Sequence, residues 1–130
     1  MTAAEPVWVD TEVVLAIHDE QLAEHGGQAG VRDRGLLESA LARPRNQYAY
    51  GETSLARLAA SIAFDISRNH PFLDGNKRTS LVVAELFLEL NGLTLTASDA
   101  QSVTTFLALA AGDLTEDELA TWIEANTQRL

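Results

Sequence analysis

The residues with the richest chemistry in this sequence lie together in the segment RNHPFLDGNKRTS, positions 68–80. The segment combines an imidazole, a carboxylate, an amide and two adjacent cations around one glycine. The candidate site residues are His70, Asp74, Gly75, Asn76, Lys77 and Arg78. Each of these groups has a use in binding or transferring a phosphate group.

A helix that begins just after Gly75 would form an anion-binding site. Glycine permits a tight turn, and the backbone N–H groups of residues 75–79 would point outward at the positive end of the helix macrodipole. Lys77 adds a point charge, and Arg78 adds a fork of donors that fits phosphate oxygens. Asn76 can offer an amide without adding charge. The start of this helix therefore predicts a phosphate site.

Two further side chains suit the transfer of a phosphate group. Asp74 would repel a bare phosphate but would help to hold one that is bridged by a hard cation such as Mg²⁺. His70 carries an imidazole, whose ordinary pKa of about 6.5 suits the acceptance of a proton near neutrality. Together the residues predict a phosphoryl or nucleotidyl transfer site. Taken singly, each is also common in ordinary loops, and Phe72 is expected to anchor this loop in the core.

Two helices must hold the segment in place. Residues 54–68 carry apolar side chains at the i, i+3, i+4 spacing of a buried helix face. Pro71 disfavours a helical conformation at the residue before it, so this helix is expected to end near Asn69. The next helix is expected from about Lys77 to the pair Asn91-Gly92. Because it is apolar nearly all round, it is predicted to be the buried central helix.

The rest of the chain is also expected to be mostly helical. Further helices are predicted over residues 11–24, from about Asp33 to Pro44, from Ser98 or Asp99, and from Thr115, which forms a capping-box pattern with Glu118. Pro44 is expected to close its helix. Residues 45–54, RNQYAYGETS, are predicted to be a loop or a short hairpin, and LTLTA is expected to be briefly extended. The predicted fold is all-α, a single domain over residues 1–130 with five to six helices around the central one.

Composition narrows the function classes. The chain has 130 residues, no cysteine and a formal net charge of −10, which excludes disulfides and argues against general binding to nucleic acid or anionic membranes. Between Arg43 and Arg78 lie six basic and three acidic residues, against three and sixteen elsewhere, so a small polyanion would be drawn to the middle of the chain. We expect no signal peptide, because the first ten residues lack a basic region followed by an apolar run, and no apolar run approaches the roughly 20 residues of a membrane span. A cytoplasmic protein is expected.

The order of residues in HPFLDGNKR resembles the signature of the Fic/Doc family, H-x-F-x-[DE]-[GA]-N-x-R. All six informative positions are present, namely His70, Phe72, Asp74, Gly75, Asn76 and Arg78. The resemblance extends to residues 16–44, which look like the N-terminal helix pair of the Doc (death-on-curing) branch, and to the LFLELNG close of the central helix. It implies a Fic/Doc-type helical domain with a short hairpin-like flap, here residues 45–54, against which the family aligns a target segment.

Two positions separate the branches of this family. Adenylylating members read G-N-G-R, with a second arginine three positions after the first, whereas this sequence has Lys77 after Asn76 and Leu81 at the place of the second arginine. The Doc branch is similar in both respects. Its members are described as protein kinases that bind ATP in the opposite sense and transfer its γ-phosphate to a Ser/Thr hydroxyl of elongation factor Tu. An adenylyltransferase and a catalytically silent binding module are the alternatives.

The resemblance also implies roles and partners. His70 would be the general base, Asp74 would position Mg²⁺, and residues 75–78 would hold the phosphates of ATP, with Arg78 also in the catalytic set. Members of this branch are usually toxins neutralised by a co-expressed antitoxin. The inhibitory pattern [ST]-x-x-x-E-[GN] of some Fic proteins does not occur in this sequence, which favours a separate antitoxin. His18, in the first helix, is expected to be structural.

Overall fold

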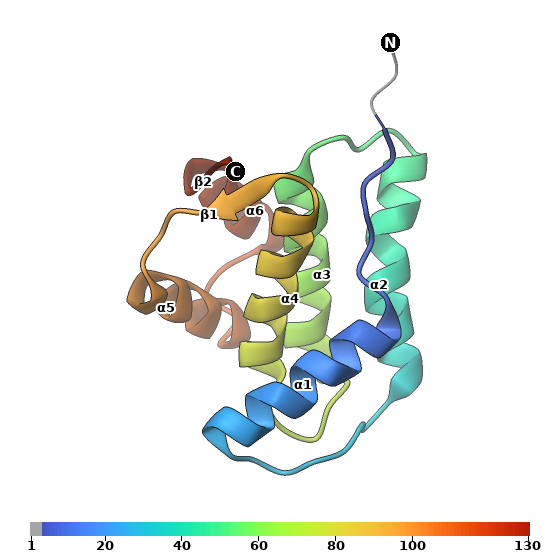
Figure 1. Ribbon diagram of the computed structural model, residues 1–130, viewed down its shortest axis with the longest axis vertical. Helices are drawn as coiled ribbons and strands as arrows, with labels where there is room; N and C mark the ends of the chain where they lie inside the picture. The colour runs from blue at the N-terminus through green and yellow to red at the C-terminus, as the bar shows by residue number, and fades with distance from the viewer. Residues whose placement is uncertain (1–3) are drawn as a thin grey trace.

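The computed structural model describes residues 4–130 of the protein. Within them, six α-helices and two short strands follow one another along the chain (Figure 1). The elements are α1 Thr11–His25, α2 Arg34–Ala49, α3 Leu55–Asn69, α4 Asn76–Leu90, β1 Leu93–Leu95, α5 Asp99–Ala110, α6 Glu116–Ala125 and β2 Thr127–Arg129. The two strands form an antiparallel pair. The all-α prediction is therefore confirmed, although β2 was not predicted.

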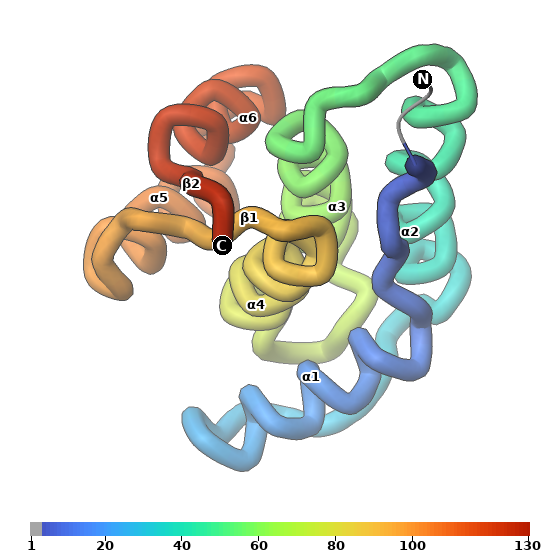
Figure 2. Tube along the Cα trace, turned by 45° about the horizontal axis from the view of Figure 1, so that its top comes forward, coloured from blue at the N-terminus to red at the C-terminus, as the bar shows by residue number. Residues whose placement is uncertain are grey.

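The helices on either side of the motif, α3 and α4, form the centre of the fold. They lie side by side in both views (Figures 1 and 2), and α3 contributes nine buried residues to the core while α4 contributes seven. α2 packs on one side of α3, α5 and α6 cover the other side of the pair, and α1 crosses the N-terminal end of α4. The predicted buried central helix, α4, is therefore present, with α3 as its partner.

The predicted end of the second helix at Pro44 is wrong, because α2 continues through it to Ala49. A proline inside a helix removes one backbone hydrogen bond and costs about 3 kcal/mol. Packing of the following turn offsets this cost. Pro44 itself is buried. Tyr48 packs edge-on against Trp8, with 6.1 Å between the two ring centres. The Arg45 guanidinium lies 5.7 Å from the centre of the same Trp8 ring. Tertiary contacts thus overrule the local stop signal.

The hairpin-like flap expected over residues 45–54 is also not formed. Residues 45–49 belong to α2, and only residues 50–54 remain to connect it to α3. This connection lies at the N-terminal end of α3, whereas the motif follows its C-terminal end (Figure 1). A helix of 15 residues separates the two, a distance of about 22 Å at 1.5 Å per residue. The segment that does border the motif is the α1–α2 connection, residues 26–33.

Several of the predicted helix starts are confirmed, and each of these helices has a capping side chain. Asp33 accepts a hydrogen bond from the backbone N–H of Leu36 at 3.0 Å ahead of α2. Ser98 and Thr115 each complete a capping box ahead of α5 and α6, which satisfies N–H groups that have no partner inside the helix. Within residues 4–130, no helix has both the length and the apolar character that a membrane crossing requires.

Candidate active site

The connection between α3 and α4 is shaped by one histidine, one proline and one glycine. His70 follows the last residue of α3 with φ 49° and ψ 61°, and among residues 4–130 it is the one non-glycine residue with positive φ. Pro71 disfavours the right-handed helical conformation at His70, so α3 ends at Asn69 as predicted. Gly75, with φ 78°, precedes α4. The left-handed conformation there suits glycine, and the chain turns sharply into the second helix.

Phe72 fixes the middle of this connection in the core, as the sequence predicts. Its side chain is 1% exposed and stacks on the imidazole of His18, with ring centres 3.8 Å apart and planes 8° apart. Nε2 of His18 lies 2.8 Å from the main-chain oxygen of Asp74. Because a carbonyl oxygen only accepts, this nitrogen carries a hydrogen. His18 is therefore a structural residue, and what it supports is the motif itself.

The side chain of Asn76 closes the same loop. Its Oδ1 accepts a hydrogen bond from the N–H of Phe72 at 3.0 Å, and its Nδ2 donates to the carbonyl of Phe72 at 2.9 Å. Asn76 is 8% exposed, and Nδ2 also lies 3.5 Å from Nδ1 of His70. Both ends of the amide therefore hold the loop, whereas the backbone N–H of Asn76, at the start of α4, has no partner inside the helix.

We expect the Asn76→Ala variant to lose about 2 kcal/mol of unfolding free energy, because the buried N–H and carbonyl of Phe72 then lose their partner. Urea unfolding followed by circular dichroism measures the change. Asn46→Ala is the matched control, since Asn46 is exposed on α2, and it should stay within about 0.5 kcal/mol of the parent. Equal stability of the two variants would show that the amide of Asn76 does not hold the loop.

Asp74 is exposed, yet both of its carboxylate oxygens are engaged. Oδ2 accepts from the backbone N–H of Gln28 at 3.1 Å and Oδ1 from that of Gly75 at 2.8 Å. These two hydrogen bonds hold the pKa of Asp74 below its ordinary value, and the one from Gln28 has the larger effect. The ionised carboxylate therefore favours the folded loop above its unfolded-state pKa, a contribution lost as the pH falls through the lowered folded-state pKa. A side chain at position 27 would crowd this carboxylate, because a Cβ on Gly27 would lie 2.9 Å from Oδ2.

Lys77 and Arg78 are two adjacent cations at the start of α4. Both are exposed, and among residues 4–130 no carboxylate forms an ion pair with either one. Four other arginines do have such partners, namely Arg34, Arg43, Arg45 and Arg57. Lys77 and Arg78 occupy the first turn of α4, where the N–H groups of residues 76–78 precede the first backbone bond of the helix, from Thr79 to Gly75. Positive charge and free donors therefore coincide at one helix end.

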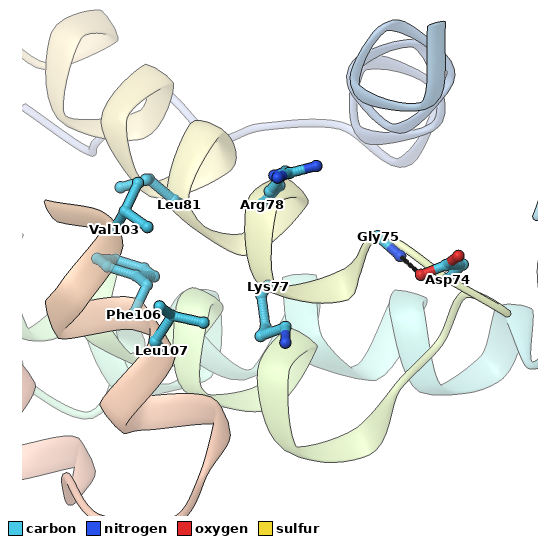
Figure 3. A pocket seen from close by; sticks show the side chains of 8 residues that line it. All are labelled: Asp74, Gly75, Lys77, Arg78, Leu81, Val103, Phe106 and Leu107. Carbon is cyan, nitrogen blue, oxygen red and sulfur yellow. Dashed lines mark hydrogen bonds between the residues drawn. The ribbon is translucent and has the colours of Figure 1, made fainter. Parts of the chain in front are cut away.

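This helix end opens into a groove between α4 and α5. A cavity of about 360 Å³ is lined on one side by polar motif residues and on the other by apolar side chains of the two helices (Figure 3). The apolar members are Leu81, Val103, Phe106 and Leu107. A second cavity of about 530 Å³ adjoins the first, shares Asp74, Gly75, Lys77 and Leu107 with it, and includes His70. The structure thus brings the predicted site residues to one groove.

Sequence reasoning missed the residues that other elements bring to the site. Val103 and Leu107 are 47% and 48% exposed, and their spacing of four residues on α5 was a signal of a common helix face. Gln28 and Arg32 had no such signal, because they act on the motif from a connection more than 35 positions away in the sequence.

The start of α4 carries two exposed cations, and an exposed histidine follows the end of α3. Residues 8–88, which run from the segment before α1 almost to the end of α4, match the model of the Fic/DOC family. The chain therefore belongs to the Fic/DOC family.

Two relatives place it closer to one branch. The chain is 45% identical over 75 residues to a protein named Toxin Doc from Mycolicibacterium smegmatis. It is 37% identical over 86 residues to one named Protein kinase doc from Escherichia phage P1. These alignments cover 55% and 65% of this chain, and 57% and 68% of the two relatives. Both names support the death-on-curing branch.

Proposed function

We propose that this protein is the toxin of a toxin–antitoxin pair and that it transfers the γ-phosphate of ATP to a Ser/Thr hydroxyl of elongation factor Tu, which blocks translation. The observation that carries the proposal is the first turn of α4, where Lys77 and Arg78 have no acidic partner in the described chain and lie beside free backbone N–H groups. His70, which lines the adjoining cavity, is within the same groove. The name of the phage relative, a protein kinase, supports phosphate transfer.

The proposed reaction is an in-line displacement at the γ-phosphorus. The oxygen of the target hydroxyl forms a bond to that phosphorus, the bond to the oxygen bridging the β- and γ-phosphates breaks, and ADP leaves. His70 accepts the proton of the hydroxyl as general base. Lys77, Arg78 and the N–H groups at the start of α4 stabilise the negative charge on the transferred group. The apolar wall of Leu81, Val103 and Leu107 offers a surface for the base of the nucleotide.

Asp74 fits the Mg²⁺ ion that accompanies ATP. Among residues 4–130 no three Asp, Glu or His side chains gather into a metal cluster, and Mg²⁺ bound with a nucleotide usually takes one or two carboxylates together with phosphate oxygens. Asp74 is one exposed carboxylate at the mouth of the groove, held ionised by two N–H groups. A bound Mg²⁺ would neutralise charge on the phosphates.

The wider proposal follows the family resemblance. The partner would be a separate antitoxin, the site of action would be the cytoplasm, and residues 1–130 would act as a single Fic/Doc domain. One continuous hydrophobic core that includes residues from Val9 to Ile123 supports the single domain.

The experiment that tests the function uses ATP labelled either on the γ- or on the α-phosphate, with elongation factor Tu as acceptor and magnesium present. We expect label on the acceptor from γ-labelled ATP alone, and a mass increase of one phosphate group on the intact acceptor. Label from the α-phosphate, with the mass of a whole nucleotide monophosphate, would identify an adenylyltransferase. Magnesium-dependent nucleotide binding without any transfer would identify a silent binding module.

A further inference from the structure

The backbone conformation of His70 is an unusual one that needs support. His70 has φ 49° and ψ 61°, a left-handed backbone conformation that residues other than glycine rarely adopt. The residue is exposed, so no packing of its own side chain in the core fixes it. The α3 helix also ends here, and the last carbonyl groups of a helix have no partner inside it. These carbonyls need partners outside α3, either another part of the chain or water.

Arg32, in the α1–α2 connection, supplies that support. Its Nε donates to the carbonyl of His70 at 2.6 Å, and one terminal nitrogen donates to the carbonyl of Asn69 at 2.5 Å. Its own backbone N–H donates to the carbonyl of Pro71 at 2.7 Å. One residue thus binds three successive carbonyls across the end of α3. A guanidinium places two donors in one rigid plane, which the single ammonium of a lysine does not.

The side chain of Arg32 has no other partner in the described chain. It is exposed, and it forms no ion pair with any carboxylate of residues 4–130. The loop also has anchors that do not depend on this guanidinium, namely the stacking of Phe72 on His18 and the hydrogen bond from the N–H of Leu73 to the carbonyl of Gly30. Loss of the side chain should therefore free the backbone of His70 without unfolding the domain.

We propose that Arg32 is a positioning residue that sets the backbone of His70 and thereby aims its imidazole into the groove. This inference rests on the proposed function for its catalytic consequence, but its structural part stands alone. Arg32 acts through His70, since it lines neither of the two cavities at the motif. A displacement of about 1 Å at a reacting group can cost up to about a hundredfold in rate. We therefore expect Arg32→Ala to lower kcat by about 10- to 100-fold while KM for ATP changes less than about threefold.

The first measurement needs no activity. Backbone chemical shifts and the HN–Hα coupling of His70, measured by NMR on the full chain, report its left-handed conformation. In Arg32→Ala we expect the chemical shifts and the coupling of His70 to move toward the values of a residue that samples several backbone conformations. Arg34→Ala is the matched control, since Arg34 is a neighbouring exposed arginine that pairs with Glu12 and Glu38 instead, and it should leave His70 unchanged. Unchanged values for His70 in Arg32→Ala would overturn the proposal.

The second measurement separates positioning from a loss of fold. Guanidinium chloride at millimolar concentration should restore part of the kcat of Arg32→Ala, because the free cation can occupy the vacated place, and it should not affect Arg34→Ala. A kcat within twofold of the parent, or no recovery with guanidinium, contradicts the proposal. If Arg32→Ala does not fold, Arg32→Lys keeps the charge but not the paired donors of the guanidinium, and it is measured by NMR and for kcat without added guanidinium. If the parent protein transfers no phosphate, the kinase proposal fails. The NMR result alone then decides whether Arg32 sets the backbone of His70.

Discussion

Replacing His70 with alanine is expected to lower the rate of phosphate transfer by about 10² to 10⁴, the usual contribution of a general base. The imidazole lies at the mouth of the groove and on the cavity that also includes Asp74 and Lys77. It makes no hydrogen bond to the core except the 3.5 Å contact with Asn76. The substitution should therefore leave the fold and the affinity for ATP nearly unchanged. Single-turnover transfer with saturating ATP measures the rate of the chemical step directly.

His25→Ala is the control for this variant. His25 ends α1, is 41% exposed at its side chain and lies 3.6 Å from the Glu24 carboxylate, so its loss should change the rate by less than twofold. If His70→Ala transferred phosphate as fast as His25→Ala, the imidazole would not be the base. If His70→Ala instead lost affinity for ATP as well as the rate of transfer, His70 would be a residue that binds the nucleotide.

The local part of the site could be predicted from the sequence because its signals are local. Pro71 restricts the residue before it, and Gly75 supplies a positive φ, so the end of α3 and the start of α4 follow from a few adjacent residues. Phe72 was expected to anchor the loop in the core and is 1% exposed. Short-range rules therefore found the loop and the side chains that its backbone carries.

The parts that failed depend on contacts between distant segments. Pro44 signals a helix end, but the contacts of the next turn with Trp8, from the start of the chain, keep α2 helical. Because the helix was expected to end at Pro44, residues 45–49 were assigned to a flap and not to α2. The segment that does lie against the motif, residues 26–33, is rich in glycine and has no periodic pattern, so nothing in its own sequence placed it there. The hydrogen bonds between the Asn76 amide and the backbone of Phe72 were not predicted either, since they depend on how the loop closes.

The first turn of α4 leads to a second prediction, in which stability and activity move in opposite directions. Cations near a helix N-terminus are unfavourable because the macrodipole is positive there, by about 0.3–1 kcal/mol each. Lys77 and Arg78 occupy such positions, and in residues 4–130 no ion pair compensates for them. Each is therefore expected to cost stability in the absence of a ligand. A bound polyanion would reverse the sign of both interactions, which is what a phosphate site requires.

We expect Arg78→Ala to lower phosphate transfer by about 10² to 10³, the effect of losing one preorganised donor to a developing charge. The free energy of unfolding should stay the same or rise by up to about 1 kcal/mol, because an unfavourable charge is removed. Transfer of γ-labelled phosphate and urea unfolding, measured on the same preparations, give the two quantities. Arg78→Lys should recover part of the activity, since it keeps the positive charge but not the paired donors of the guanidinium group.

Arg57→Ala provides the matched comparison, because Arg57 holds the third position of α3 just as Arg78 holds the third position of α4. Arg57 differs in having acidic partners, with Glu52 at 3.8 Å and Asp117 at 3.3 Å. Its removal should leave activity unchanged and lower stability by about 0–1 kcal/mol. If Arg78→Ala instead destabilised the protein more than Arg57→Ala and kept full activity, the charge at the start of α4 would serve the fold, and the phosphate site would have to lie elsewhere.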